Sequence, residues 1–84
     1  MTLPATLTPE RWILQLFSAR AAAQGGVLRR SVADVERMVG RDRFLHEIRR
    51  RGYRVIENAG QFVIFCNTEP VKVLHPGGTG GKFL

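Results

Sequence analysis

At Gly52 the spacing of the hydrophobic residues changes, and this change limits the fold more than any other feature of the sequence. Before Gly52, hydrophobic residues recur every three or four positions, which is typical of amphipathic helices. After it, the runs Tyr53–Ile56 and Gln61–Phe65 are rich in β-branched and aromatic residues, with Asn58–Gly60 between them. Two such runs joined by a short Asn/Gly turn predict a β-hairpin. We therefore expect an α+β fold in which helices precede a hairpin.

The first helix is predicted to begin after Thr8 and to run to about Gln24. Thr8 is a suitable N-cap, Pro9 suits the first helical position, and Glu10 places an acid in the first turn. The pair Gly25-Gly26 then stops the helix. The next residues, 27–30, fit a brief strand.

Two further helices are expected, with only two or three residues between them. Ser31 is the predicted N-cap of a helix that runs to Val39 and is closed by Gly40, and Asp42 is the predicted cap of a helix that runs to Arg51. Helices so close in sequence must pack at an angle, as in a helix-turn-helix. The hydrophobic residues that we expect on their buried sides are Val32, Val35, Met38 and Val39 in the first and Phe44, Leu45 and Ile48 in the second.

The ends of the chain are expected to lie outside the domain. Residues 1–7 resemble a flexible leader, and four glycines among residues 76–81 favour a disordered tail, which leaves 8–75 as one domain. Within it, Val71–Leu74 either add a short edge strand or lie extended across the domain. The longest uncharged apolar run, Phe62–Cys66, is far shorter than the ~20 residues that a membrane span needs. No signal peptide is visible and Cys66 is the single cysteine, so we expect a cytoplasmic protein.

The charge of the chain is concentrated in its middle. Lys and Arg number 13 against seven Asp and Glu, which gives a net charge of +6. The stretch from Arg29 to Arg54 holds nine Arg and four acids, and so carries +5 of that charge. A basic domain with its charge in one segment favours a polyanionic partner, nucleic acid first. The alternative is that these arginines only form a solvated surface.

The predicted order of elements resembles that of winged helix-turn-helix DNA-binding domains. The run Phe44–Val55, followed by Gly60–Val63, is similar to the junction of recognition helix and wing in small bacterial and phage members of that class. The resemblance implies three helices plus a C-terminal β-hairpin wing. It also implies that the third helix enters the major groove of double-stranded DNA. Gly40 departs from the glycine spacing of the phage-repressor type, because that spacing would place His46 and Arg49 where apolar residues belong.

The predicted contact residues lie on the third helix and beside it. A turn of 100° per residue puts Arg43, His46 and Arg50 opposite the apolar side of this helix, with Arg49 at the edge. Arg side chains there can donate to guanine or to phosphate oxygens. The resemblance assigns Arg54 to the base of the wing and Asn58 and Gln61 to its tip. The remaining candidates, Arg29 and Arg30, either touch phosphate or end a strand that faces water.

Other functions have less support in the sequence. His46 and His75 lie far apart and Cys66 ends an apolar strand, so we expect no catalytic site, cofactor or metal. Phe62–Phe65 are apolar on both faces of their strand, which suggests a homodimer through the hairpin. DNA binding in transcriptional regulation, or in phage or mobile-element biology, with a location on the nucleoid, is therefore the main prediction. A winged-helix adaptor for a protein partner and an RNA-binding module remain as alternatives.

Overall fold

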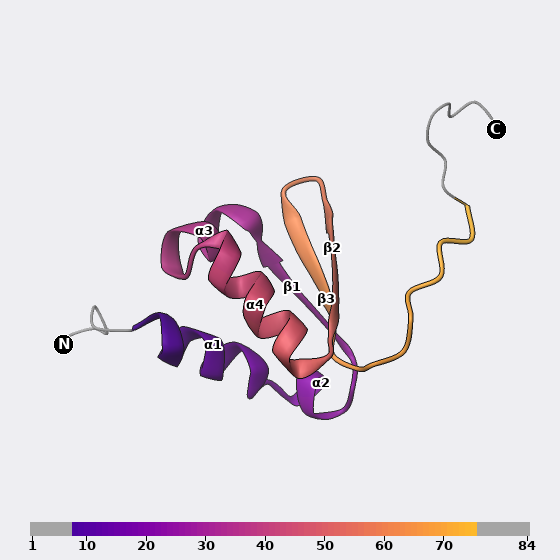
Figure 1. Cartoon of the computed structure of the whole chain (residues 1–84), viewed down its shortest axis with the longest axis horizontal. Coiled ribbons are helices and arrows are strands. Elements are labelled where there is room, and N and C mark those ends of the chain that lie inside the picture. Colours follow the sequence, from indigo (N-terminus) through magenta and orange to yellow (C-terminus); the bar gives the residue numbers. More distant parts are fainter. Residues whose placement is uncertain (1–7, 76–84) are drawn as a thin grey trace.

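An antiparallel sheet carries the helices of the domain on one face (Figure 1). The computed structural model describes residues 8–75, which contain four helices and three strands. The α+β class expected from the sequence is confirmed. The leader (1–7) and the Gly-rich tail (76–84) lie outside the described residues. The elements are α1 (Pro9–Phe17), α2 (Arg20–Ala23), β1 (Val27–Ser31), α3 (Val32–Met38), α4 (Arg41–Arg51), β2 (Arg54–Asn58) and β3 (Gln61–Phe65).

The predicted first helix is in fact two helices. Thr8 caps α1 as expected, since its hydroxyl accepts a hydrogen bond from the Arg11 amide at 3.2 Å. The helix then ends at Phe17, because the Ser18 hydroxyl donates to a carbonyl of the last turn and Ala19 is extended. In one straight helix Leu16 and Ala22 would point about 120° apart. The break allows both of them to be buried in the same core.

The turn between α3 and α4 is made at a glycine, and α4 is not capped by the predicted aspartate. Ser31 caps α3, with its hydroxyl accepting from the Asp34 amide at 2.9 Å, as the sequence indicated. Asp42 was wrongly expected to cap α4: Gly40, at φ 94°, precedes the helix, and Asp42 lies in the first turn. A φ of this kind strongly favours glycine, so the turn is made one residue before the helix begins. Of the four hydrophobic residues expected to be buried on α3, only Val35 is fully buried.

The predicted hairpin is confirmed, but it does not stand apart as a terminal wing. Strands β2 and β3 are joined by Ala59 and Gly60, both with positive φ, as in the turns that suit two-residue hairpins. Strand β3 also pairs with β1, so the sheet order is β1-β3-β2 and β3 is its central strand. The expectation of three helices plus a C-terminal hairpin wing is therefore corrected to four helices packed on a three-stranded sheet. Residues 71–74 form no strand.

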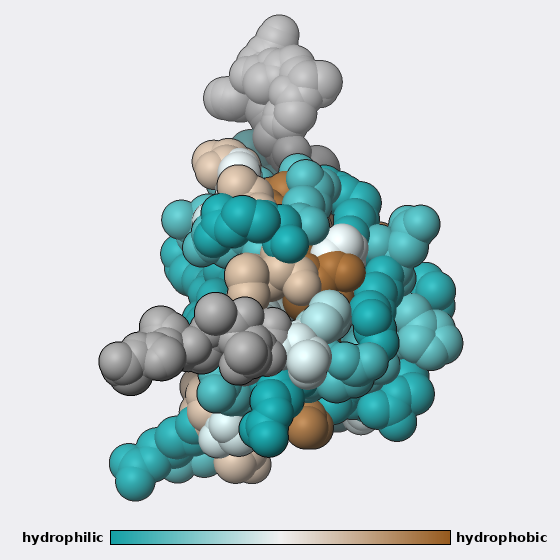
Figure 2. Space-filling model, turned by 90° about the vertical axis from the view of Figure 1, so that its left-hand side faces the viewer, coloured by the Kyte–Doolittle hydropathy of each residue, from teal (hydrophilic) through white to brown (hydrophobic). Residues whose placement is uncertain are grey.

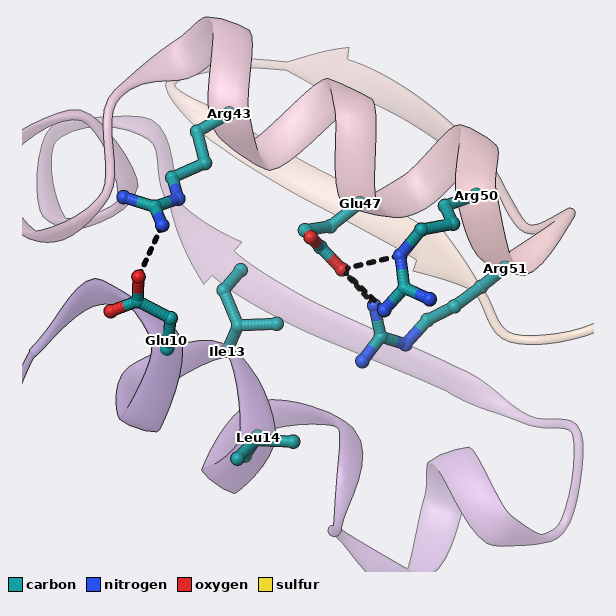
Figure 3. A pocket seen from close by; sticks show the side chains of 7 residues that line it. All are labelled: Glu10, Ile13, Leu14, Arg43, Glu47, Arg50 and Arg51. Atoms are coloured by element: carbon teal, nitrogen blue, oxygen red, sulfur yellow. Dashed lines mark hydrogen bonds and ion pairs between the residues drawn. The ribbon is translucent and has the colours of Figure 1, made fainter.

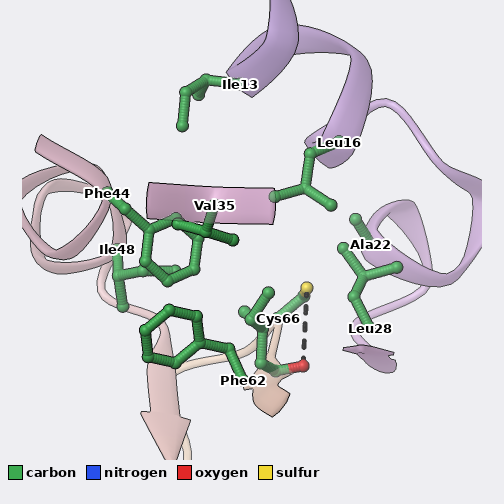
Figure 4. Close-up of a cluster of buried hydrophobic side chains, with 10 residues drawn as sticks. Ile13, Leu16, Ala22, Leu28, Val35, Phe44, Ile48, Phe62 and Cys66 are labelled. Carbon is green, nitrogen blue, oxygen red and sulfur yellow. Dashed lines mark hydrogen bonds between the residues drawn. The ribbon is translucent and has the colours of Figure 1, made fainter. Parts of the chain in front are cut away.

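The core lies between the helices and the inward face of the sheet (Figure 4). Helix α4 contributes Phe44 and Ile48, as predicted, while Leu45 is only partly buried. The Phe44 ring stacks on Phe62 of β3, with 4.9 Å between the ring centroids. This contact fixes α4 against the sheet and so decides which side of the helix faces solvent. The buried hydrophobic residues are Ile13, Leu16, Ala22, Leu28, Val35, Phe44, Ile48, Phe62, Ile64 and Cys66.

Replacing Gly52 by Ala should lower the free energy of unfolding by more than replacing Gly60 by Ala. Both glycines have positive φ, at 76° and 78°, where a Cβ costs about 1–2 kcal/mol. A Cβ on Gly52 would also lie 3.3 Å from Cγ2 of Thr68, whereas one on Gly60 would meet nothing within 4 Å. Urea unfolding of the two variants measures the difference. Equal losses would show that the Thr68 contact is without effect.

Candidate nucleic-acid interface

The side of α4 that faces solvent carries the residues predicted to contact DNA. Arg43, His46, Arg49 and Arg50 are all exposed, opposite the buried Phe44. On the side of the molecule that carries α3 and the start of α1, hydrophilic side chains cover most of the coloured surface, with small apolar areas between them (Figure 2). The four predicted residues of α4 therefore share one polar, solvent-facing surface, which we call the α4 outer face.

Two of these four side chains are engaged by carboxylates (Figure 3). Arg43 forms an ion pair with Glu10 of α1, and Arg50 pairs with Glu47 on its own helix at 3.1 Å. The side chains of His46 and Arg49 have no hydrogen bond or ion pair with any residue of the described chain. Exposed ion pairs of this kind contribute about 0–1 kcal/mol. They therefore orient the two arginines without preventing an exchange of carboxylate for phosphate.

The pKa of Glu10 is affected by the position of this residue at the start of α1. Its own backbone amide and then the charge of Arg43 lower the pKa of the carboxyl group. An acid in the first turn of a helix is favoured by the exposed amides there. Glu10 is thus ionised at neutral pH and competes with any anion that approaches Arg43.

Arg51 has a structural role at the C-terminal end of α4. Its guanidinium lies over the Phe17 ring of α1, 4.6 Å from the centroid, and it also pairs with Glu47. The Arg51 side chain is only 19% exposed. The contact joins the C-terminal end of α4 to α1. It also borders a hollow of about 180 Å³ between the two helices (Figure 3). The exposed side chain of Leu14 is part of the apolar lining of this hollow.

Glu47 should make the stability of the domain depend on pH. The hydrogen bond from Arg51, and after it that from Arg50, lowers the pKa of Glu47 below the ordinary value of 4.5. A lowered pKa in the folded state stabilises the protein above about pH 4.5, and this contribution is lost as the pH falls through the folded pKa. Glu47→Gln should therefore lower the free energy of unfolding at pH 7 more than at pH 2. Urea unfolding at both values tests this, and an equal loss at the two would contradict it.

Arg41 has a structural role that the sequence did not predict. Its guanidinium donates to Glu36 of α3 at 3.0 Å and to Glu57 of β2 at 3.1 Å, and it lies over the Phe62 ring. It therefore ties α3, α4 and β2 together and neutralises the acid near the tip of the hairpin. No local signal predicted this, because the partners come from two other elements.

The arginines of the sheet do not join the α4 outer face. Arg29 and Arg54 occupy positions on the side of the sheet that faces away from the helices. Arg30 points to the helix side, donates to the Arg29 carbonyl, and borders a hollow of about 200 Å³ beside Trp12. The predicted contact set is thus divided among the α4 outer face, the far side of the sheet and the hollow beside Trp12. Asn58 and Gln61 are exposed beside the hairpin turn.

The groups considered for other chemistry are separated or buried. Cys66 is buried, and this burial raises the pKa of its thiol, so it stays in the less reactive protonated form. Within residues 8–75, no three His, Cys, Asp or Glu side chains meet as metal ligands do. Over the same residues, no helix has both the length and the apolar character of a membrane span.

Comparison of the chain with protein-family models, with curated proteins and with solved structures found no match. The class of molecule that the described residues define is a small α+β domain.

Proposed function

We propose that this protein binds double-stranded DNA through the α4 outer face, in the manner of a winged helix-turn-helix domain. The observation that carries the proposal is one helix with two opposed sides. Phe44 and Ile48 hold it in the core, and four donor-bearing side chains face solvent on the other side. A helix that reads a groove needs this separation. The surplus of six positive charges supplies the long-range attraction to phosphate.

The order of the elements supports the same proposal. A helical segment, a strand, two helices and a hairpin follow one another along the chain, and the hairpin shares a sheet with the first strand. This arrangement is compatible with a winged helix. The hairpin turn, Ala59-Gly60, has no basic side chain, and Glu57 nearby is paired with Arg41. We therefore assign groove and phosphate contacts to α4, and none to the tip of the hairpin.

The test is the binding of the whole chain to a fluorescently labelled duplex of random sequence, followed by anisotropy from 50 to 200 mM salt. The logarithm of the association constant should fall linearly with that of the salt concentration, with a slope of about −0.9 for each phosphate neutralised. An RNA duplex of the same sequence is the comparison. Tighter binding to RNA would favour the RNA-binding alternative, and no binding to either polymer at 50 mM salt would refute the proposal.

Glu10→Gln should increase the affinity for duplex DNA by about two- to fivefold, because it frees Arg43 from an ion pair of about 0–1 kcal/mol. The matched control is Glu69→Gln, which raises the net charge by the same amount but lies outside the helices. Anisotropy titrations of both variants at one salt concentration measure the difference. The same gain for the two would assign the effect to net charge alone and remove Arg43 from the contact.

A further inference from the structure

The face of the sheet that points away from the helices is apolar in its centre. Strand residues alternate between the two faces, and residues that pair across the sheet share a face. Val27 and Ile56 on this face are 45% and 44% exposed, and Val63 and Phe65 of the central strand lie between them. The nine residues of this face, which we call the sheet outer face, are Val27, Arg29, Ser31, Arg54, Ile56, Asn58, Gln61, Val63 and Phe65.

The charge of the sheet outer face has a single sign. Arg29 and Arg54 are its charged members, and none of the nine is acidic. Arg54 donates to the backbone carbonyls of Gly52 and Thr68, and neither arginine meets a carboxylate of the described chain. The two positive charges are therefore available to a partner, on opposite edge strands of the sheet.

We propose that the sheet outer face is a docking surface for an amphipathic helix of an acidic protein. Neighbouring strands lie about 4.8 Å apart, so the three strands span about 10 Å, which is the width of one helix. An apolar stripe on such a helix would cover Val63 and Ile56. Acidic residues along its two sides would then meet Arg29 at one edge and Arg54 at the other.

The character of this surface favours an acidic protein over two other occupants. A second copy of the chain would bring arginines against arginines in a molecule of net charge +6, which costs free energy unless a counter-charge lies between them. Single-stranded nucleic acid is disfavoured because Phe65 is the one aromatic residue among the nine, whereas successive bases stack on several aromatic side chains. The charge of this surface therefore favours a partner of opposite charge over the homodimer through the hairpin that the sequence suggested.

A hollow at one end of the sheet outer face offers a position for a side chain of the partner. It has a volume of about 360 Å³ and lies between Phe65 and the segment Glu69–Lys72. Val71, which is 38% exposed, belongs to its lining. A leucine or phenylalanine at the end of the apolar stripe would fill this hollow, as anchor residues of interfaces do.

The experiment uses the whole ¹⁵N-labelled chain and a synthetic helical peptide of 14 residues with a leucine stripe flanked by glutamates. A second peptide has lysine in place of every glutamate. NMR titration should move amide signals of β1, β2 and β3 with the glutamate peptide, and none with the lysine peptide. Perturbation confined to α4, or no perturbation, would overturn the proposal.

Point variants distinguish binding of the peptide at the sheet outer face from general attraction between opposite charges. Ile56→Asp and Arg29→Glu should each weaken binding of the glutamate peptide at least tenfold, while Arg49→Ala, which removes a charge from the α4 outer face, should leave it within twofold. Ile56→Asp, which alters no candidate DNA contact, should keep the DNA affinity of the unaltered chain within about threefold, so the two proposals fail independently. Equal weakening by Arg49→Ala would overturn the docking surface, as would self-association in sedimentation that Ile56→Asp abolishes.

Discussion

Replacing Arg43, Arg49 and Arg50 together by Ala should weaken binding to duplex DNA about 100-fold at 50 mM salt. Each replacement removes one charged donor, and a lost contact of about 1 kcal/mol for each gives about 3 kcal/mol in total, or two powers of ten. The slope of the salt dependence should also become shallower by about 2.7, because three fewer phosphates are neutralised. Anisotropy titrations at four salt concentrations would measure both changes.

The control for this result removes the same charge elsewhere. Arg11, Arg20 and Arg37 are exposed on α1, α2 and α3, so the triple Ala variant at these positions also lowers the net charge by three. If only general attraction acts, the two triple variants lose the same affinity. The proposal requires the α4 variant to lose at least tenfold more than the control, and a smaller difference would contradict it.

Phe44→Ala should lower the free energy of unfolding by about 3–5 kcal/mol, the usual result of emptying a phenylalanine site in a core. Phe44 is fully buried, and its ring stacks on Phe62 between α4 and the sheet. Small domains unfold at a cost of about 5–15 kcal/mol, so this one change removes a large part of the stability. Urea unfolding followed by far-ultraviolet circular dichroism is the measurement.

Two further variants test whether the loss of stability in Phe44→Ala comes from the emptied site in the core. Leu14→Ala removes an apolar side chain that is 62% exposed, and should change the free energy of unfolding by at most about 0.5 kcal/mol. Phe44→Leu fills most of the site and should retain the fold with a smaller loss than Phe44→Ala. If Phe44→Ala unfolds no more easily than Leu14→Ala, the stacked pair does not hold α4 in place.

The local elements could be predicted because their signals lie within a few residues. The hydroxyl of Ser31 reaches an amide three positions away, and Gly52 adopts the left-handed conformation that ends α4. The hairpin likewise follows from two β-rich runs and the turn at Ala59-Gly60. The polar side of α4 followed from helical spacing once Phe44 and Ile48 were taken as buried.

The predictions that were wrong, and the features that were not predicted, depend on parts of the chain that are distant in sequence. The break after Phe17 follows from the need to bury both Leu16 and Ala22 in a core shared with the sheet. Arg41 acquires its role from carboxylates on α3 and β2, and Arg43 acquires its partner from α1, 33 positions earlier. Helical spacing gives the direction of a side chain, and it does not give the element that will lie in that direction.

The sequence by itself determined the α+β class, the N-caps of α1 and α3, the hairpin and the concentration of positive charge between Arg29 and Arg54, because these depend on neighbours and on composition. Only the tertiary structure decided how that charge is distributed. Pairing of β1 with β3 turned Arg29 to the far side of the sheet, and packing of α1 beside α4 gave Arg43 a carboxylate partner. Alternation along a strand fixes opposite faces, but packing decides which face is covered by helices and which is left to solvent.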